Sequence, residues 1–234
     1  MGDLFHEDIP IAILEPIFET MQWTPWHTYL ILTKRPERME FAWRTLCQTF
    51  NGGYPTAPLD NVWLGVTVEN QATADERIPL LLQTPAAVRF VSAEPLLGPV
   101  DLWPWLPINS GQEDYSDNPP PPQWEREYTR PDLENLLSLV ITGGETGPGA
   151  RPMHPDWARG LRDQCQASGV SYFFKQWGEW TSYHNAPDGV RREIDQGKYQ
   201  DGFIDDEHVY RVGNKRAGKL LDGVRWDQMP EVAK

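Results

Sequence analysis

Apolar residues in this chain gather in short runs, and each run ends next to an ionisable residue. The runs lie at residues 28–33, 62–68, 88–92, 138–142 and 170–174. Between most of them, apolar residues recur at three- and four-residue spacing, which is the period of an amphipathic helix. Successive runs start about 30 residues apart, except where an insertion intervenes, and this is the usual length of a strand–helix–strand repeat. The pattern therefore predicts an α/β fold with a parallel sheet.

Helix signals agree with this repeat. Helices are predicted at residues 9–21, 36–50 and 155–168, and Asn70 is a candidate N-cap for another that extends through Gln83. Pro79 is expected to split that helix into two shorter turns. A complete (βα) barrel has about eight strands, so five runs indicate either an open sheet or a barrel that lacks its first units. We predict a partial, TIM-like barrel with an apolar gap or an open edge.

Two stretches break the repeat. Residues 103–135 contain the polar, Pro-rich run 109–122, which cannot form a core and predicts an exposed insertion loop. After Trp180 the chain turns polar and irregular. We expect residues 1–180 to form the partial barrel and residues 181–234 to form a carboxyl-terminal extension packed on the same domain. Within the extension, residues 207–226 are expected to form a small hairpin or lid around the basic segment Gly213–Gly218. Residues 213–219 are expected in a solvated turn, with a contact to nucleic acid or an acidic partner as the alternative.

Composition excludes several classes of protein. A net charge of −13 disfavours non-specific binding to nucleic acid. No apolar run approaches the roughly 20 residues of a membrane helix, and no secretory signal is present, so a cytoplasmic protein is expected. The two cysteines, Cys47 and Cys165, lie in separate predicted helices and cannot by themselves hold an iron–sulfur cluster. Residues Asp3–Asp8 have metal-ligand chemistry, but a solvated helix start explains them better, and no metal site is predicted.

The ionisable residues at the strand ends are the candidate catalytic site. They are Lys34, Glu69, Glu94, Glu145 and Lys175. Parallel strands end at one edge of a sheet, so these residues are expected to share a charged mouth. The carboxylates could bind a cation or act as acid and base, and the lysines could orient an anionic substrate. The structural alternative is that each glutamate caps a helix or pairs with a nearby lysine or arginine.

A glycine-rich loop follows the fourth run and is the candidate cofactor-binding segment. Gly143 and Gly144 close the run, and Gly147 and Arg151 follow before a helix that opens at Pro155. Backbone amides in such a loop can cradle a phosphate group. The spacing of these glycines matches neither a Walker A motif nor G-x-G-x-x-G, so neither motif supports phosphate binding by this loop.

Several ordered motifs are similar to those of one known family, and together they span almost the whole chain outside the Pro-rich insertion. They are Asp3–Asp8, Leu32–Met39, Val62–Glu69, Phe90–Asp101, Gly143–His154, Phe173–Trp180 and Ala217–Gly223. On these motifs the chain resembles the phage gene-product thirty-seven/sixty-eight family, a group of unknown function found in phages and bacteria.

This resemblance implies an organisation like that of radical-SAM proteins. Family members carry an amino-terminal three-cysteine motif of the kind that binds an iron–sulfur cluster, which implies S-adenosylmethionine as a second cofactor. Some are linked in name and gene neighbourhood to a three-Cys-motif partner protein, which is the expected partner here. Met1 aligns with an internal position of the family, so the resemblance implies that the cysteine segment is absent and that this chain holds no cofactor itself.

Two main hypotheses about function follow, and whether the chain is an enzyme stays open. In the first, it is an amino-terminally truncated, radical-SAM-like protein of unknown substrate and reaction, inactive as a cluster enzyme on its own. In the second, it is a non-catalytic binding module or remnant that acts through a partner. A further alternative is a metal-independent hydrolase or transferase that uses the glutamates.

Overall fold

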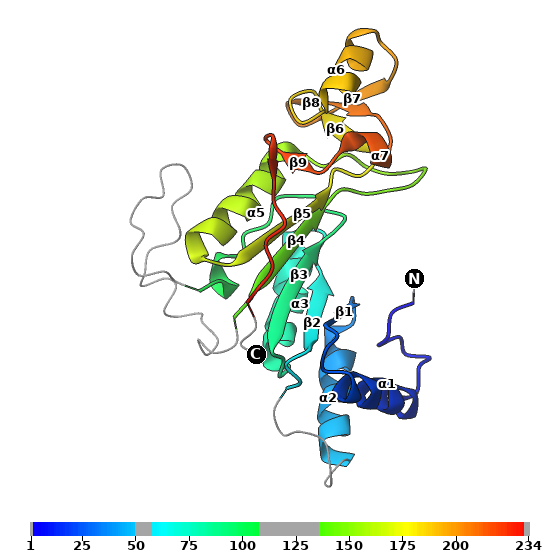
Figure 1. Ribbon diagram of the computed structural model, residues 1–234, viewed down its shortest axis with the longest axis vertical. Helices are drawn as coiled ribbons and strands as arrows, with labels where there is room; N and C mark the ends of the chain where they lie inside the picture. The colour runs from blue at the N-terminus through cyan, green and yellow to red at the C-terminus, as the bar shows by residue number, and fades with distance from the viewer. Residues whose placement is uncertain (1, 50–57, 108–135, 232–234) are drawn as a thin grey trace.

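A five-stranded parallel sheet lies at the centre of the protein (Figure 1). The computed structural model describes residues 2–49, 58–107 and 136–231. Strand order in the sheet follows chain order, so every crossover steps in the same direction, as in a (βα) barrel. The predicted α/β fold of consecutive βα units is confirmed. The strands are β1 (Tyr29–Thr33), β2 (Val62–Thr67), β3 (Val88–Ala93), β4 (Leu139–Gly143) and β5 (Ser171–Gln176).

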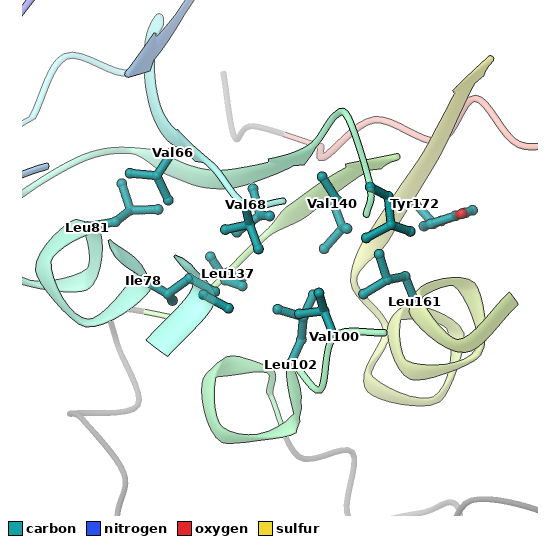
Figure 2. Packing of buried hydrophobic residues seen from close by; sticks show 14 of the residues in the cluster. Val66, Val68, Ile78, Leu81, Val100, Leu102, Leu137, Val140, Leu161 and Tyr172 are labelled. Atoms are coloured by element: carbon teal, nitrogen blue, oxygen red, sulfur yellow. The ribbon is translucent and has the colours of Figure 1, made fainter. Parts of the chain in front are cut away.

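The helices pack on one face of this sheet and share its larger core. They are α1 (Ile11–Trp23), α2 (Pro36–Thr49), α3 (Gln71–Gln83), α5 (Pro155–Ser168) and the short 3₁₀ turn η1 (Trp103–Trp105). Figure 2 shows Val66 and Val68 of the second βα unit meeting Ile78 and Leu81 of α3. Strands buried on both faces read as continuous apolar runs, which is why the sequence pattern located them well.

Helix α3 differs from its prediction at Pro79. The helix continues through this proline. The predicted cap at Asn70 is confirmed, because its side chain accepts a hydrogen bond from the Thr73 amide at 3.1 Å. The expected break is wrong because Ile78 and Leu81 on either side are fully buried against the sheet. This packing outweighs the hydrogen bond that the proline removes.

The opposite face of the sheet carries a smaller apolar cluster. Trp63, Val88, Phe90 and Leu139 are buried there. On the edge strand β1, Leu30 lies beside Trp63 in register and is 43% exposed. Leu32, two residues on, is 40% exposed. Within the described residues β1 pairs only with β2, so this side of the sheet ends in an apolar edge.

The carboxyl-terminal extension is ordered, in contrast to the irregular structure expected. It forms an antiparallel sheet in the order β6-β8-β7 and a small β9–β10 hairpin. Segment Gly213–Gly218 contains a helical turn and is not a hairpin tip, so the hairpin expected around it is wrong, while its role as a lid stays a prediction. Strands β7 and β8 are mostly exposed or half-buried, so they do not appear as apolar runs in the sequence. The elements are β6 (Trp180–Ser182), α6 (Asp188–Asp195), β7 (Gln200–Ile204), β8 (Glu207–Arg211), α7 (Asn214–Ala217), β9 (Leu220–Leu221) and β10 (Val224–Arg225).

The chain after β10 runs along the free edge of β5. The Phe174 amide donates to the Trp226 carbonyl at 2.9 Å, and the Gln228 amide donates to the Tyr172 carbonyl at 3.2 Å. These bonds join the extension to the central parallel sheet. The predicted boundary after residue 180 falls inside strand β6, which begins at Trp180. The division of the chain into residues 1–180 and residues 181–234 stays a prediction. The Pro-rich run 109–122 lies outside the described residues.

Among the helices that the structure describes, none combines the length and hydropathy that a membrane crossing requires.

The apolar edge at β1 predicts self-association. We expect the purified chain to form concentration-dependent oligomers and Leu30→Lys/Leu32→Lys to reduce them, because a lysine on an edge strand opposes strand pairing between molecules. Sedimentation velocity over a range of concentrations measures this. Phe203→Lys is the control, since Phe203 is 70% exposed but lies on β7. Equal association of the wild type and the Leu30/Leu32 variant would contradict the role of this edge.

Candidate functional site

The strand-end residues named from the sequence all lie at the carboxyl edge of the sheet. Lys34 and Glu94 directly follow β1 and β3, while Glu69 and Glu145 stand two residues beyond β2 and β4. Lys175 is the penultimate residue of β5. Since the strands are parallel, these residues share one edge. Their catalytic role stays a prediction, but the glutamates do pair with cations, as the structural alternative proposed.

Glu69 lies between two cations. Lys34 Nζ donates to its Oε1, and Arg77 Nη1 donates to its Oε2 at 2.9 Å. Arg77 also donates to the Thr67 carbonyl at 2.8 Å, which fixes it against the end of β2. The Glu69 side chain is only 14% exposed, whereas Lys34 is 53% exposed. The two cations therefore pair with a carboxylate that is largely shielded from water.

Glu94 is held by two side chains from the end of β5, which lies beyond β4 in the sheet. Lys175 Nζ donates to its Oε2 at 2.7 Å, and Gln176 Nε2 donates to its Oε1 at 3.1 Å. A Cβ at Gly143 would lie 3.1 Å from Glu94 Oε1. Gly143 thus leaves room for the Glu94 carboxylate on this edge. Lys175 remains 52% exposed while Glu94 is 20% exposed.

Glu145 forms a bidentate pair with Arg151. Arg151 Nε and Nη2 donate to the two carboxylate oxygens at 2.8 Å each, and the Arg151 amide adds a third bond at 2.8 Å. The Arg151 side chain lowers the pKa of Glu145 to about 2, first through these hydrogen bonds and then through its charge. The same hydrogen bonds, followed by the charges of Glu145 and Glu69, raise the pKa of Arg151. Arg151 is therefore within electrostatic reach of Glu69.

The glycine loop is fastened to the extension by its backbone. The Gly144 amide donates to the Gln176 carbonyl at 3.0 Å, and the Gly147 amide donates to Glu179 Oε1 at 3.2 Å. Arg211 Nη2 donates to the Gly147 carbonyl at 3.1 Å. A phosphate group at Gly147 would have to replace Glu179. The cofactor-binding role of Gly143, Gly144, Gly147 and Arg151 stays a prediction.

Sequence reasoning missed several residues that organise this edge. Asp3 accepts hydrogen bonds from Thr33 Oγ1 at 2.8 Å and from Arg35 Nη1 at 2.9 Å, so it fastens the amino-terminal segment to the end of β1. Arg77 and Gln176 complete the surroundings of Glu69 and Glu94. The sequence offered one signal for Arg77, which lies eight residues after Glu69 in the same βα unit. Within the described residues, no group of three or more His, Cys, Asp or Glu side chains could hold a metal ion.

The cysteines do not fit a three-thiolate cluster. The whole chain has two, Cys47 and Cys165. Cys165 is fully buried in α5, and burial raises the pKa of its thiol. Cys47 lies on α2, a different helix. An iron–sulfur cluster of the radical-SAM kind needs three thiolates close together, which these residues cannot supply.

Comparison with protein-family models matches residues 1–230 to the family described as "Protein of unknown function (DUF5131)". No curated protein matches the chain, and no solved structure matches it.

A first prediction concerns the backbone at Gly144. A Cβ there would lie 1.9 Å from the Trp177 carbonyl oxygen. Gly144→Ala should therefore force the ends of β4 and β5 apart and lower the free energy of unfolding by about 3 kcal/mol. Chemical denaturation measures this. Gly149→Ala is the matched control, since nothing lies within 4 Å of its Cβ position, and it should change stability by less than about 0.5 kcal/mol. Equal effects of the two variants would refute the close backbone contact.

A second prediction concerns pH. The pKa of Glu145 lies at about 2 in the folded state, below its ordinary value of 4.5. The pair with Arg151 thus stabilises the protein fully above about pH 4.5 and loses this contribution as the pH falls through 2. Arg151→Met should be less stable than wild type near neutral pH, with a difference that shrinks in acid.

Carboxyl NMR titration of Glu145, with denaturation at several pH values, measures both effects. Arg225→Met is the control, since Arg225 makes an exposed pair with Asp227 and should contribute little. A Glu145 that titrates near its ordinary pKa in the wild type would be incompatible with this account.

Proposed function

The chain belongs to the DUF5131 family of proteins of unknown function, which is the phage gene-product thirty-seven/sixty-eight family that its motifs predicted. On this premise, we propose that the carboxyl edge of its sheet binds a small ligand with both positive and negative groups. The resemblance to radical-SAM-like proteins suggests S-adenosylmethionine as this ligand. Its carboxylate, ammonium and sulfonium groups match the charges on the edge.

One observation supports the proposal above all: three shielded carboxylates, each paired with an exposed cation, lie along a single edge. Glu69, Glu94 and Glu145 are 14%, 20% and 24% exposed, and each pairs with a cation that is at least half exposed. A cation that remains in contact with water can bind an incoming anion without first being desolvated.

The two kinds of group have separate roles in the proposal. Lys34 and Lys175 recognise the carboxylate of the ligand, as point charges on flexible side chains. Glu69 and Glu94 bind its cationic groups through their carboxylates. Arg151 is held by Glu145 in a fixed bidentate geometry, which suits positioning better than exchange. No proton transfer is assigned to any of these residues.

A cluster-dependent reaction of this ligand would require another protein. Because the cysteines of this chain do not fit a cluster, no cluster-dependent step is derived for it. We infer a ligand-binding module that acts through a partner, and the resemblance suggests the three-Cys-motif partner protein as that partner. Two cysteines on separate helices are typical of a protein from a reducing compartment, and we infer that this chain acts in the cytoplasm. Neither substrate nor reaction follows from the geometry.

Calorimetric titration with S-adenosylmethionine tests the proposal. Glu94→Gln and Lys175→Met should each weaken binding at least about tenfold, since hydrogen bonds to charged groups contribute about 1.5–3 kcal/mol. S-Adenosylhomocysteine, which lacks the sulfonium charge, should bind more weakly than S-adenosylmethionine. Glu19→Gln and Lys215→Met are the controls, because both residues are exposed and lie away from the strand ends.

Thermal unfolding of each variant establishes that a loss of binding is not a loss of folding. Where Glu94→Gln destabilises the chain, the double variant Glu94→Gln/Lys175→Met removes both charges of the pair and retains its hydrogen-bonding shape in part. The proposal fails if the folded wild type does not bind S-adenosylmethionine, or if the strand-end variants bind it as well as the controls do.

A further inference from the structure

A second candidate site lies in the carboxyl-terminal extension, away from the strand-end glutamates. A cavity of about 290 Å³ opens between the segment that leads into α6 and the segment that forms the β9–β10 hairpin. Its walls include His184, Pro187, Arg191, Lys219 and Leu220. In Figure 1 these elements lie together beyond the carboxyl end of β5.

The two walls of this cavity are held together by a buried side chain. Asn185 is 6% exposed, and its Oδ1 accepts a hydrogen bond from the Asp222 amide at 2.8 Å. Its Nδ2 donates to Ser182 Oγ at 3.0 Å. Gly218 adopts a φ of +86°, and a Cβ there would lie 3.5 Å from Pro187. The cavity is therefore built from fixed backbone on both sides.

Charge in the cavity has the opposite sign to the chain as a whole. The protein has a net charge of −13, yet Arg191 and Lys219 line this cavity and Asp188 is its only carboxylate. Asp188 is 83% exposed and lies 3.6 Å from Arg191, so it neutralises that cation weakly. Lys219 has no hydrogen-bond or ion-pair partner among the described residues. A local positive charge in a concave site favours an anion.

The backbone next to both cations is anchored. Arg191 Nε donates to the Ala186 carbonyl at 2.8 Å, which holds its guanidinium beside the cavity. The residues on either side of Lys219 bind Trp177, because the Gly218 carbonyl accepts from the Trp177 amide at 3.4 Å and the Leu220 carbonyl accepts from Trp177 Nε1 at 2.8 Å. Lys219 therefore projects from an anchored segment and keeps its ammonium group available.

We propose that this cavity binds a small organic phosphate, with Arg191 and Lys219 as its phosphate ligands. Arginine and lysine both bind phosphate groups, arginine through directed N–H donors and lysine as a point charge. The volume exceeds what a phosphate group alone needs, and Ala186, Pro187 and Leu220 offer apolar contact to an organic part. Leu220 is 44% exposed, as expected for a side chain at the rim of a site that is partly open. The proposal does not depend on the function proposed for the strand ends.

Calorimetric titration of the full chain with adenosine 5′-monophosphate, inorganic phosphate and adenosine tests this. Adenosine 5′-monophosphate is expected to bind most tightly, inorganic phosphate more weakly, and adenosine not measurably. Lys219→Met should weaken the binding of adenosine 5′-monophosphate at least about tenfold, and Lys219→Glu should abolish it. Because Lys219 has no partner among the described residues, neither substitution is expected to affect folding.

Lys215→Met and Lys215→Glu are the matched controls, since Lys215 is an exposed lysine four residues earlier that does not line the cavity. Arg191→Met, compared with Arg192→Met, tests the second cation in the same way. The proposal is overturned if no phosphate probe binds, if adenosine binds as well as its phosphate, or if the Lys215 variants lose as much affinity as the Lys219 variants. Binding lost only on Lys219 and Arg191 substitution would support it.

Discussion

The close backbone contact between the ends of β4 and β5 is the constraint on which most of this structure depends. The Trp177 carbonyl fills the space where Gly144 would carry a Cβ, and the Glu145 carbonyl fills the corresponding space at Gly178. No other residue type fits either position without moving the backbone. The same contact includes a hydrogen bond from the Glu179 amide to the Glu145 carbonyl at 2.9 Å. This contact thus places Glu145 at the carboxyl edge of the sheet and directs the chain toward the extension.

Several features follow from this contact. Glu179, which directly precedes β6, accepts a hydrogen bond from the Gly147 amide, so the glycine loop and the start of the extension hold each other in place. Trp177, fully buried beside Gly144, donates to the Leu220 carbonyl and so fastens the β9–β10 hairpin. The strands of the parallel sheet, the loop and the extension are therefore one packed unit at this end of the sheet. Both candidate sites adjoin it.

Electrostatics at the carboxyl edge reflect a balance between burial and charge. Burial disfavours an ionised carboxylate, while a nearby cation favours it. At Glu145 the fixed bidentate arginine prevails, and its pKa falls well below the ordinary range. The lysines at the other two glutamates each donate one hydrogen bond, whereas Arg151 donates three to Glu145. In the function proposed here, this difference separates a structural ion pair from the pairs that a ligand enters.

Much of this arrangement was determined by the sequence alone. Strands buried on both faces appear as apolar runs, and one direction for all of them brings Lys34, Glu69 and Glu94 to one edge. The tertiary structure decided which charges meet. Lys175 pairs with Glu94, 81 residues away, because β5 lies beyond β4 in the sheet, and Arg77 reaches Glu69 from α3. The helix through Pro79 and the strands of the extension likewise depend on packing against distant residues. Local periodicity and propensity do not contain such long-range contacts, and these could be seen only in the folded chain.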